Sequence, residues 1–191
     1  MVFELIVIVS YCFFIITFLR NSNYSIKKSS SDLFALINKD ELTQLYNRHY
    51  LSNVLEKSNK KFSFALADID NFKQINDIYG HSTGDFVLKE VSRIFKKYKN
   101  EKLTIVRFGG DEFLFIFECD NEKEIIRLME KIRKEIEEKD FGQDLRSDKV
   151  SISCGVTKCS IVNSWNETFE KVDKALYKAK EEGRNRVCFI N

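Results

Sequence analysis

Two adjacent acids, Asp111 and Glu112, follow the glycine pair Gly109–Gly110 in this chain. Apolar runs of strand length lie on both sides of them, at residues 103–108 and 113–117, which predicts a short antiparallel hairpin. Glycine leaves space beside the backbone for a bulky anion, and carboxylates are the oxygen ligands that hard cations prefer. The tip therefore suits a metal ion that holds a polyphosphate, although solvated acids in an ordinary turn are the alternative.

A second acidic segment, which contains Asp68 and Asp70, closes another apolar run at residues 62–67. If that run is the strand beside the hairpin, Asp68 lies close to Asp111 at one edge of a sheet. Carboxylates that converge from two neighbouring strands can hold two divalent cations against a triphosphate. Asp68 could otherwise be a turn residue at a strand end, and Asp70 could be structural.

Five segments, in this order, resemble the signatures of the GGDEF family of diguanylate cyclases, which condense two GTP molecules into cyclic di-GMP. They are residues 40–48, 68–77, 79–85, 107–113 and 175–185, the fourth of which contains the namesake Gly-Gly-Asp-Glu-Phe. The resemblance implies a palm-like α+β fold, shared with nucleotide cyclases and polymerases. In that fold, helices flank a central and mainly antiparallel sheet.

The resemblance also implies a role for each acid at the two strand ends. Asp68, the backbone carbonyl of Ile69, and Asp111 would bind two Mg²⁺ ions per site, or Mn²⁺ in their place. Glu112 would act on the 3′-hydroxyl of GTP, either as the general base that accepts its proton or as the group that orients it. Catalysis is thus expected from Asp68, Asp111 and Glu112.

Recognition of GTP is implied for two further groups of residues. Asn76 and Asp85 would read guanine, because a carboxylate accepts from N1–H and the 2-amino group while an amide bonds to O6. An acid early in a helix, as Asp85 is, also complements the helix dipole without any ligand. The residues implied at the phosphates are Phe72, Lys73, Gly109, Gly110, Lys180 and Arg184. The last two could equally serve only as cations at a helix C-terminus.

One such site holds one GTP, so the resemblance implies that two protomers meet face to face to make the cyclic product. Many relatives bind that product as an inhibitor at an Arg-x-x-Asp pair before the namesake motif. Asn100 and Leu103 occupy those positions here, which predicts that this inhibitory site is absent. Two rival functions are a catalytically silent GTP-binding regulatory module and a cyclase with another nucleotide product. The intact namesake motif disfavours the first, and Asp85 disfavours the second.

The N-terminal run Val2–Leu19 is apolar apart from Glu4 and a few small polar positions. Its length is close to the shortest that spans a bilayer, so we expect a single-pass transmembrane helix at residues 1–20. A cleaved signal peptide fits poorly because no basic residue precedes the run, and a buried soluble helix is the other alternative. Basic residues follow only its C-terminal side, at Arg20, Lys27 and Lys28, which predicts a catalytic domain in the cytoplasm of a bacterium.

Composition sets the remaining limits. A hydrophobic fraction of 43% is enough for one core, so we expect one domain, at residues 40–191, after a partly helical connector at residues 21–39. Asp32 could cap a helix in that connector. The net charge is only +2, and no basic stripe suggests a nucleic-acid partner.

Apolar periodicity within the domain predicts five helices and five strands. The helices are expected at residues 47–59, 72–79, 83–98 and 121–139, and from Trp165 to a C-cap at Gly183. The strands are expected at residues 62–68, 103–108, 113–118, 150–156 and 187–190.

Overall fold

A computed structural model of the protein describes residues 2–55, 61–118, 121–142, 145, 149–158, 160–161 and 165–190. Some side chains within these ranges, notably those of residues 2–12, lie outside the described part. The chain divides into two compact units, Met1–Asn38 and Lys39–Asn191.

The first unit is a single helix, α1 (Val2–Asn38). The capping chemistry of Asp32 predicts a helix that begins there, and this prediction is wrong: α1 runs through residue 32 without a break. The polar stretch at residues 21–31 contains no glycine, and the chain contains no proline at all. Nothing in the stretch therefore forces the helix to end.

The apolar part of α1 bears on the predicted membrane span. Among the described residues, no helix has the length and apolarity needed to cross a bilayer. The side chains of residues 2–12, which form the first half of the predicted span, lie outside the described part. In the part that follows, several large apolar side chains are exposed, among them Phe13, Phe14, Ile16, Phe18 and Leu19. The span at residues 1–20 therefore stays a prediction.

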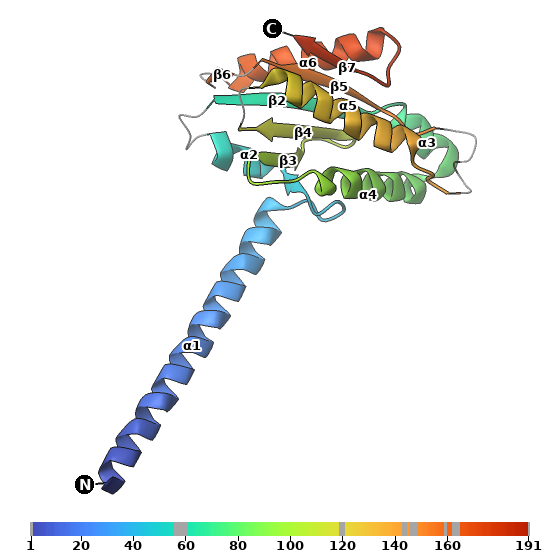
Figure 1. Ribbon diagram of the computed structural model, residues 1–191. Coiled ribbons are helices and arrows are strands. Elements are labelled where there is room, and N and C mark those ends of the chain that lie inside the picture. The colour runs from blue at the N-terminus through green and yellow to red at the C-terminus, as the bar shows by residue number, and fades with distance from the viewer. Residues whose placement is uncertain are drawn as a thin grey trace. The chain divides into compact units, whose positions relative to one another are not determined.

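The second unit is built on a mixed sheet with strand order β1-β3-β4-β2-β5-β7, and β6 pairs with the outer end of β2 (Figure 1). The strands are β1 (Tyr46–Asn47), β2 (Lys61–Ile69), β3 (Leu103–Arg107), β4 (Glu112–Phe117), β5 (Ile152–Thr157), β6 (Ser160–Ile161) and β7 (Val187–Ile190). Pairing is antiparallel except between β1 and β3 and between β5 and β7. The predicted mainly antiparallel α+β sheet is confirmed. Only the two-residue strands β1 and β6 were not expected, because two residues show no periodicity.

Helices cover both faces of this sheet. They are α2 (Arg48–Leu55), α3 (Phe72–Tyr79), α4 (His81–Lys97), α5 (Glu122–Glu138) and α6 (Trp165–Glu181). The uncharged part of β4, residues 113–117, is buried as predicted, and alternate residues enter two separate cores. Phe113 and Phe115 pack with α4 and α5, whereas Leu114 and Ile116 pack with α2 and α6.

Close contact between α6 and β5 depends on Gly155. A Cβ atom at this position would overlap the backbone of Val172 and Leu176 in α6. Glycine therefore allows the helix to lie directly against the strand, and this contact sets the height of α6 over the sheet. The position of α6 matters because Lys180 lies in its last turn.

Candidate active site

The pairing of β2 with β4 brings the two acidic segments together. Asp68, near the end of β2, lies opposite Glu112, the first residue of β4. The next residue in β2, Ile69, donates its backbone N–H to the carbonyl oxygen of Asp111 at 3.3 Å. The prediction that the run at residues 62–67 forms the strand beside the hairpin is thus confirmed. Asp68, Asp111 and Glu112 converge where β2 ends and β4 begins, and this place is called the acidic edge below.

The convergence perturbs the ionisation of these acids. Asp68 is only 7% exposed, and its Oδ2 lies 2.9 Å from the ammonium of Lys180. Burial raises the pKa of Asp68 to about 6, the contact with Lys180 opposes that rise, and the charges of Asp111 and Glu112 add to it. Burial and the charge of Asp111 likewise raise the pKa of Glu112, although Lys180 opposes them.

The chemistry of this edge fits divalent cations that are shared with a substrate. Asp68, Asp111 and Glu112 repel one another in a partly desolvated place, where Lys180 contacts Asp68 and the charges of Lys180 and Arg48 act on Glu112. Among the described residues, no three acidic, histidine or cysteine side chains form a complete metal cage. Mg²⁺ usually binds through one or two carboxylates together with substrate phosphates, so Asp68, Asp111 and the carbonyl of Ile69 are a sufficient protein share.

The hairpin tip is held in place by Arg107, a residue that motif reasoning did not assign to the site. Its guanidinium donates to the carbonyl of Gly110 at 2.7 Å and to the carboxylate of Asp40 at 3.0 Å. The backbone N–H of Phe108 closes the turn by donating to the carbonyl of Glu112 at 2.8 Å. Arg107 and Asp40 belong to two of the signature segments, which is the signal that could have paired them.

The two glycines of the pair have different surroundings. Neither Gly109 nor Gly110 has a positive φ, so the turn does not require their conformational freedom. A Cβ atom on Gly109 would lie 2.7 Å from Oε2 of Glu112, whereas one on Gly110 would meet nothing within 4 Å. Gly109 therefore makes room for the Glu112 carboxylate. The open space at Gly110 agrees with the predicted approach of a phosphate.

The predicted guanine-reading residues belong to consecutive helices, α3 and α4. Gly84, in the first turns of α4, faces Asn76 of α3, since a Cβ atom on Gly84 would overlap the Asn76 amide. Asp85 follows Gly84 directly and is exposed. Its role as a ligand for guanine stays a prediction, but Gly84 is needed for the position of Asn76, and the motif reasoning named no role for it.

Apart from the two glycines at the hairpin tip, the residues predicted at the phosphates fall into three places. Lys180 lies at the acidic edge, as its contact with Asp68 shows. Arg184 is exposed in the turn between α6 and β7. Phe72 begins α3 just past the end of β2 and packs against the core. Lys73 is exposed, and no described contact joins it to the acids.

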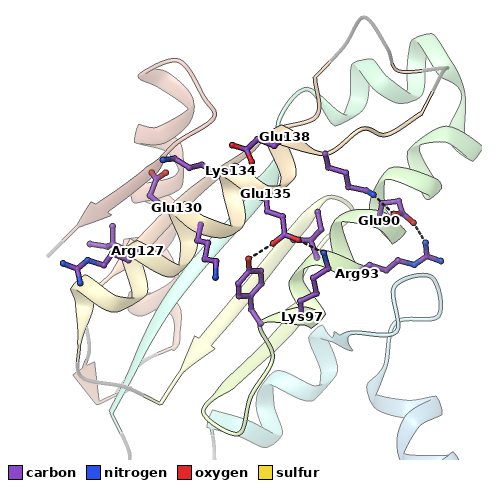
Figure 2. A pocket seen from close by; sticks show the side chains of 13 residues that line it. Glu90, Arg93, Lys97, Arg127, Glu130, Lys134, Glu135 and Glu138 are labelled. Atoms are coloured by element: carbon purple, nitrogen blue, oxygen red, sulfur yellow. Dashed lines mark hydrogen bonds and ion pairs between the residues drawn. The ribbon is translucent and has the colours of Figure 1, made fainter.

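A separate groove of about 890 Å³ lies between α4 and α5 (Figure 2). Both acidic and basic side chains line the groove, and many of them form ion pairs with one another. Glu135 accepts from Lys97 and Tyr98, and Glu90 pairs with Arg93 and Lys139. None of the residues predicted at the active site lines it. The groove is therefore separate from the residues predicted to carry the reaction.

The two residues that replace the Arg-x-x-Asp pair follow α4 and have different surroundings. The side chain of Asn100 accepts from the backbone N–H of Lys102 at 2.8 Å, within its own turn. Leu103 is 2% exposed and begins β3. One side chain is thus engaged locally, and the other is part of the core.

Comparison with known proteins agrees with this geometry. The profile of the family described as "Diguanylate cyclase, GGDEF domain" matches residues 37–186. The chain belongs to this family. The GGDEF domain of the chain is similar to diguanylate cyclase A of Treponema denticola, with 36% identity over 170 residues, which are 83% of this chain and 46% of that protein. The chain thus spans about half the length of that relative.

Two further similarities are to a staphylococcal protein and to a solved structure. A protein of Staphylococcus haemolyticus, described as an uncharacterized membrane protein, is 34% identical over 149 residues, which are 75% of this chain and 42% of that protein. The crystal structure of the coiled coil and GGDEF domain of DgcB from Caulobacter crescentus, in complex with c-di-GMP, has a TM-score of 0.75 at 28% identity. The match covers 90% of this chain and 97% of that one.

The raised pKa of Asp68 leads to a prediction about stability. Because the pKa is about 6 in the folded chain and 3.8 ordinarily, the ionised carboxylate destabilises the fold above pH 6. Asn is neutral at every pH, so Asp68→Asn should raise the free energy of unfolding by on the order of 1–3 kcal/mol at pH 8. The gain should shrink as the pH falls from 6 toward 3.8 and vanish below that range, where Asp68 is protonated in both states. Urea unfolding in EDTA across this range measures it.

Asp77→Asn is the matched control, because Asp77 is an exposed acid on α3. Its unfolding free energy should match that of the unaltered chain at every pH. If Asp68→Asn were less stable than the unaltered chain at pH 8, the claim that ionised Asp68 destabilises the fold would be wrong.

Proposed function

We propose that this chain is a diguanylate cyclase, which converts two GTP molecules into cyclic di-GMP and two pyrophosphates. The observation that carries the proposal is the convergence of Asp68, Asp111 and Glu112 beside the open turn at Gly110. Partly buried carboxylates beside the ammonium of Lys180 would suit a site for magnesium and triphosphate. The cluster destabilises the fold, and no structural role of the cluster offsets this destabilisation.

The triphosphate would be held from two sides in this site. Asp68, Asp111 and the carbonyl of Ile69 would bind two Mg²⁺ ions, which neutralise phosphate charge and polarise the reacting oxygens when they are present. Lys180 and Arg184 would bind phosphate oxygens directly, and Arg184 offers a fork of donors suited to them. Phe72 and Lys73, at the start of α3, would complete the phosphate side.

Guanine would be selected by Asn76 and Asp85. The carboxylate of Asp85 can accept from N1–H and the 2-amino group, and the Asn76 amide can donate to O6. Adenine presents the opposite pattern of donors and acceptors. It would leave both protein groups unpaired, which is the costly kind of mismatch.

Bond formation requires two protomers, because each active site holds one nucleotide. The 3′-oxygen of each GTP would attack the α-phosphorus of the other, forming a phosphodiester bond as the α–β phosphoanhydride bond breaks and pyrophosphate leaves. The carboxylate of Glu112 would accept the proton of the 3′-hydroxyl or orient that hydroxyl. Its raised pKa makes it the stronger base. Dimerisation is then the natural point of control.

We also propose that the product does not inhibit this enzyme through the Arg-x-x-Asp pair of its relatives. Asn100 bonds within its own turn, and Leu103 is buried, so neither offers a charged group to a phosphate or a guanine. The rival function of a silent GTP-binding module lacks a comparable observation in its favour. The intact namesake motif and the convergence of Asp68, Asp111 and Glu112 support a catalytic function instead.

The main prediction concerns turnover. The full chain, purified in detergent and incubated with Mg²⁺ and GTP, should release cyclic di-GMP, identified by mass spectrometry. Glu112→Gln should lower kcat by about 100-fold or more, since a group that moves or orients a proton typically contributes that much. GTP binding, measured by calorimetry, should remain. Glu170→Gln, at an exposed acid of α6, is the control and should match the unaltered rate.

Two results would count against this function. GTP that binds but never reacts, even at high protein concentration, would favour the silent regulatory module. A different dinucleotide or a mononucleotide as the product would favour the second rival.

Gly84 leads to a prediction about base selectivity. Gly84→Ala places a methyl group where the Asn76 amide lies, so the amide must move. The preference for GTP over ATP in kcat/KM should fall by roughly tenfold, the usual effect of losing one base-reading hydrogen bond to a polar site. Ser82→Ala, at an exposed neighbour on α4, should leave the preference unchanged. An intact preference in Gly84→Ala would exclude Asn76 as a guanine reader.

For the N-terminal unit, we propose a single membrane span at residues 1–20 with the catalytic domain in the cytoplasm. Support comes from the uncharged run at residues 5–19, the exposed Phe14 and Phe18 on α1, and the basic residues that follow only its C-terminal side. The staphylococcal relative is described as a membrane protein. Confinement to a plane would also raise the rate at which protomers meet.

This anchor predicts that the expressed full chain sediments with membranes and resists extraction by alkaline carbonate. Replacement of Phe14 and Phe18 by Asp should release it, because a charge within so short a span opposes insertion, by up to about 3 kcal/mol at the centre and less toward the end. Replacement of the exposed Leu33 and Leu36, outside the span, is the control and should not. Recovery of the unaltered chain in the carbonate supernatant would contradict the anchor.

A further inference from the structure

Asp70 lies two residues beyond Asp68 but has a different set of partners. It is 5% exposed, and its carboxylate accepts hydrogen bonds from the hydroxyls of Ser151 and Ser153, each at 2.6 Å. A third bond comes from the backbone N–H of Asn185 at 3.1 Å. The carboxylate is therefore engaged by protein donors, which distinguishes Asp70 from the acids that face Lys180.

The turn that Asp70 reaches has an unusual backbone. Gly183, Arg184 and Asn185 follow one another with φ values of 111°, 63° and 48°. Left-handed conformations cost about 1–2 kcal/mol for a residue with a side chain, so they persist only where neighbouring groups hold them. This turn connects α6, which carries Lys180, with β7, and Arg184 is its central residue.

The side chain of Asn185 fixes the same turn from the opposite side. Its Oδ1 accepts from the guanidinium of Arg133 at 2.7 Å, and its Nδ2 donates to Glu137 at 2.8 Å. Arg133 and Glu137 are themselves paired at 2.9 Å on α5. The turn is thus held by Asp70 through its backbone and by α5 through one amide side chain.

We propose that Asp70 and Asn185 are positioning residues for the triphosphate, which act by holding Arg184 at a set distance from the metal-binding end of β2. The inference rests on the proposed function. Asp70 continues the strand that presents Asp68 and Ile69, and Asn185 directly follows Arg184 in the chain. One buried carboxylate therefore joins the metal side of the site to its cationic side. Without this connection, the binding of phosphate must also order the turn, which weakens affinity.

A thermodynamic cycle tests this role. The full chain binds a GTP analogue with a methylene group between its α- and β-phosphates, in Mg²⁺, and calorimetry gives the dissociation constant. Asn185→Gly removes both side-chain bonds but keeps the left-handed backbone accessible. It should weaken binding by about fivefold to tenfold, because Arg184 would no longer be held in position for its contact with phosphate. In the background of Arg184→Ala, the same change should weaken binding by less than about twofold, because coupled residues are not additive.

Asp70→Asn and Asp70→Ala form a second, independent pair. Asn keeps one oxygen for Ser151 and Asn185 while its amide can donate to Ser153, so affinity should stay within about threefold of the unaltered chain. Ala removes all the acceptors and should weaken binding as much as Asn185→Gly. Lys174→Ala, at an exposed residue of α6, is the control and should have no effect. Circular dichroism checks that each variant is folded.

The outcomes separate the inference from the proposed function. Equal weakening by Asn185→Gly with and without Arg184 would overturn the positioning role, as would unaltered affinity in Asn185→Gly. Loss of binding in Asp70→Asn as severe as in Asp70→Ala would also overturn it, and would indicate that Asp70 is a metal ligand. If the unaltered chain failed to bind the analogue at all, the proposed function itself would fall, and the inference with it.

Discussion

Antiparallel pairing between β2 and β4 is the constraint on which the rest of the site depends. Asp68 lies opposite Glu112 only in the observed register, and a shift by one residue would turn Asp68 into the mainly apolar core on the other face of the sheet. Two cores, one on each face of the sheet, oppose such a shift along the whole of β4. Hydrophobic burial at the phenylalanines therefore determines where the carboxylates lie, although no phenylalanine of β4 belongs to the acidic cluster.

The proposed cation site at the acidic edge lowers the stability of the fold. Asp68 is buried beside Asp111 and Glu112, and one ammonium, that of Lys180, is the counter-charge closest to it. A protein under selection for stability alone would place an uncharged residue here. In the proposed function, the same unfavourable field would attract Mg²⁺ with its nucleotide, and the binding of substrate would relieve a repulsion already present in the folded chain.

The positive charge at this edge comes from a distant part of the chain, because Lys180 lies 112 residues after Asp68 and 68 residues after Glu112. The close approach of α6 to β5 at Gly155 sets the position of Lys180, and the turn after α6 carries Arg184. Asp70 bonds to that turn from the strand of Asp68. The two halves of the proposed triphosphate site are therefore connected through a buried carboxylate and not only through the general packing of the domain.

Sequence alone determined the family, the acids, and the strands and long helices, because each depends on local information: signature spacing, apolar periodicity and glycine placement. It could not determine the two-residue strands β1 and β6, the continuity of α1 past Asp32, or the reason for Gly109. Those features depend on neighbours that are distant in the chain. The same holds for the partners of Arg107 and Asp70, since a charged side chain chooses its contacts only when strands and turns have met. Tertiary structure thus decided which of two acids, alike in sequence and two residues apart, faces Lys180 and which one holds a turn.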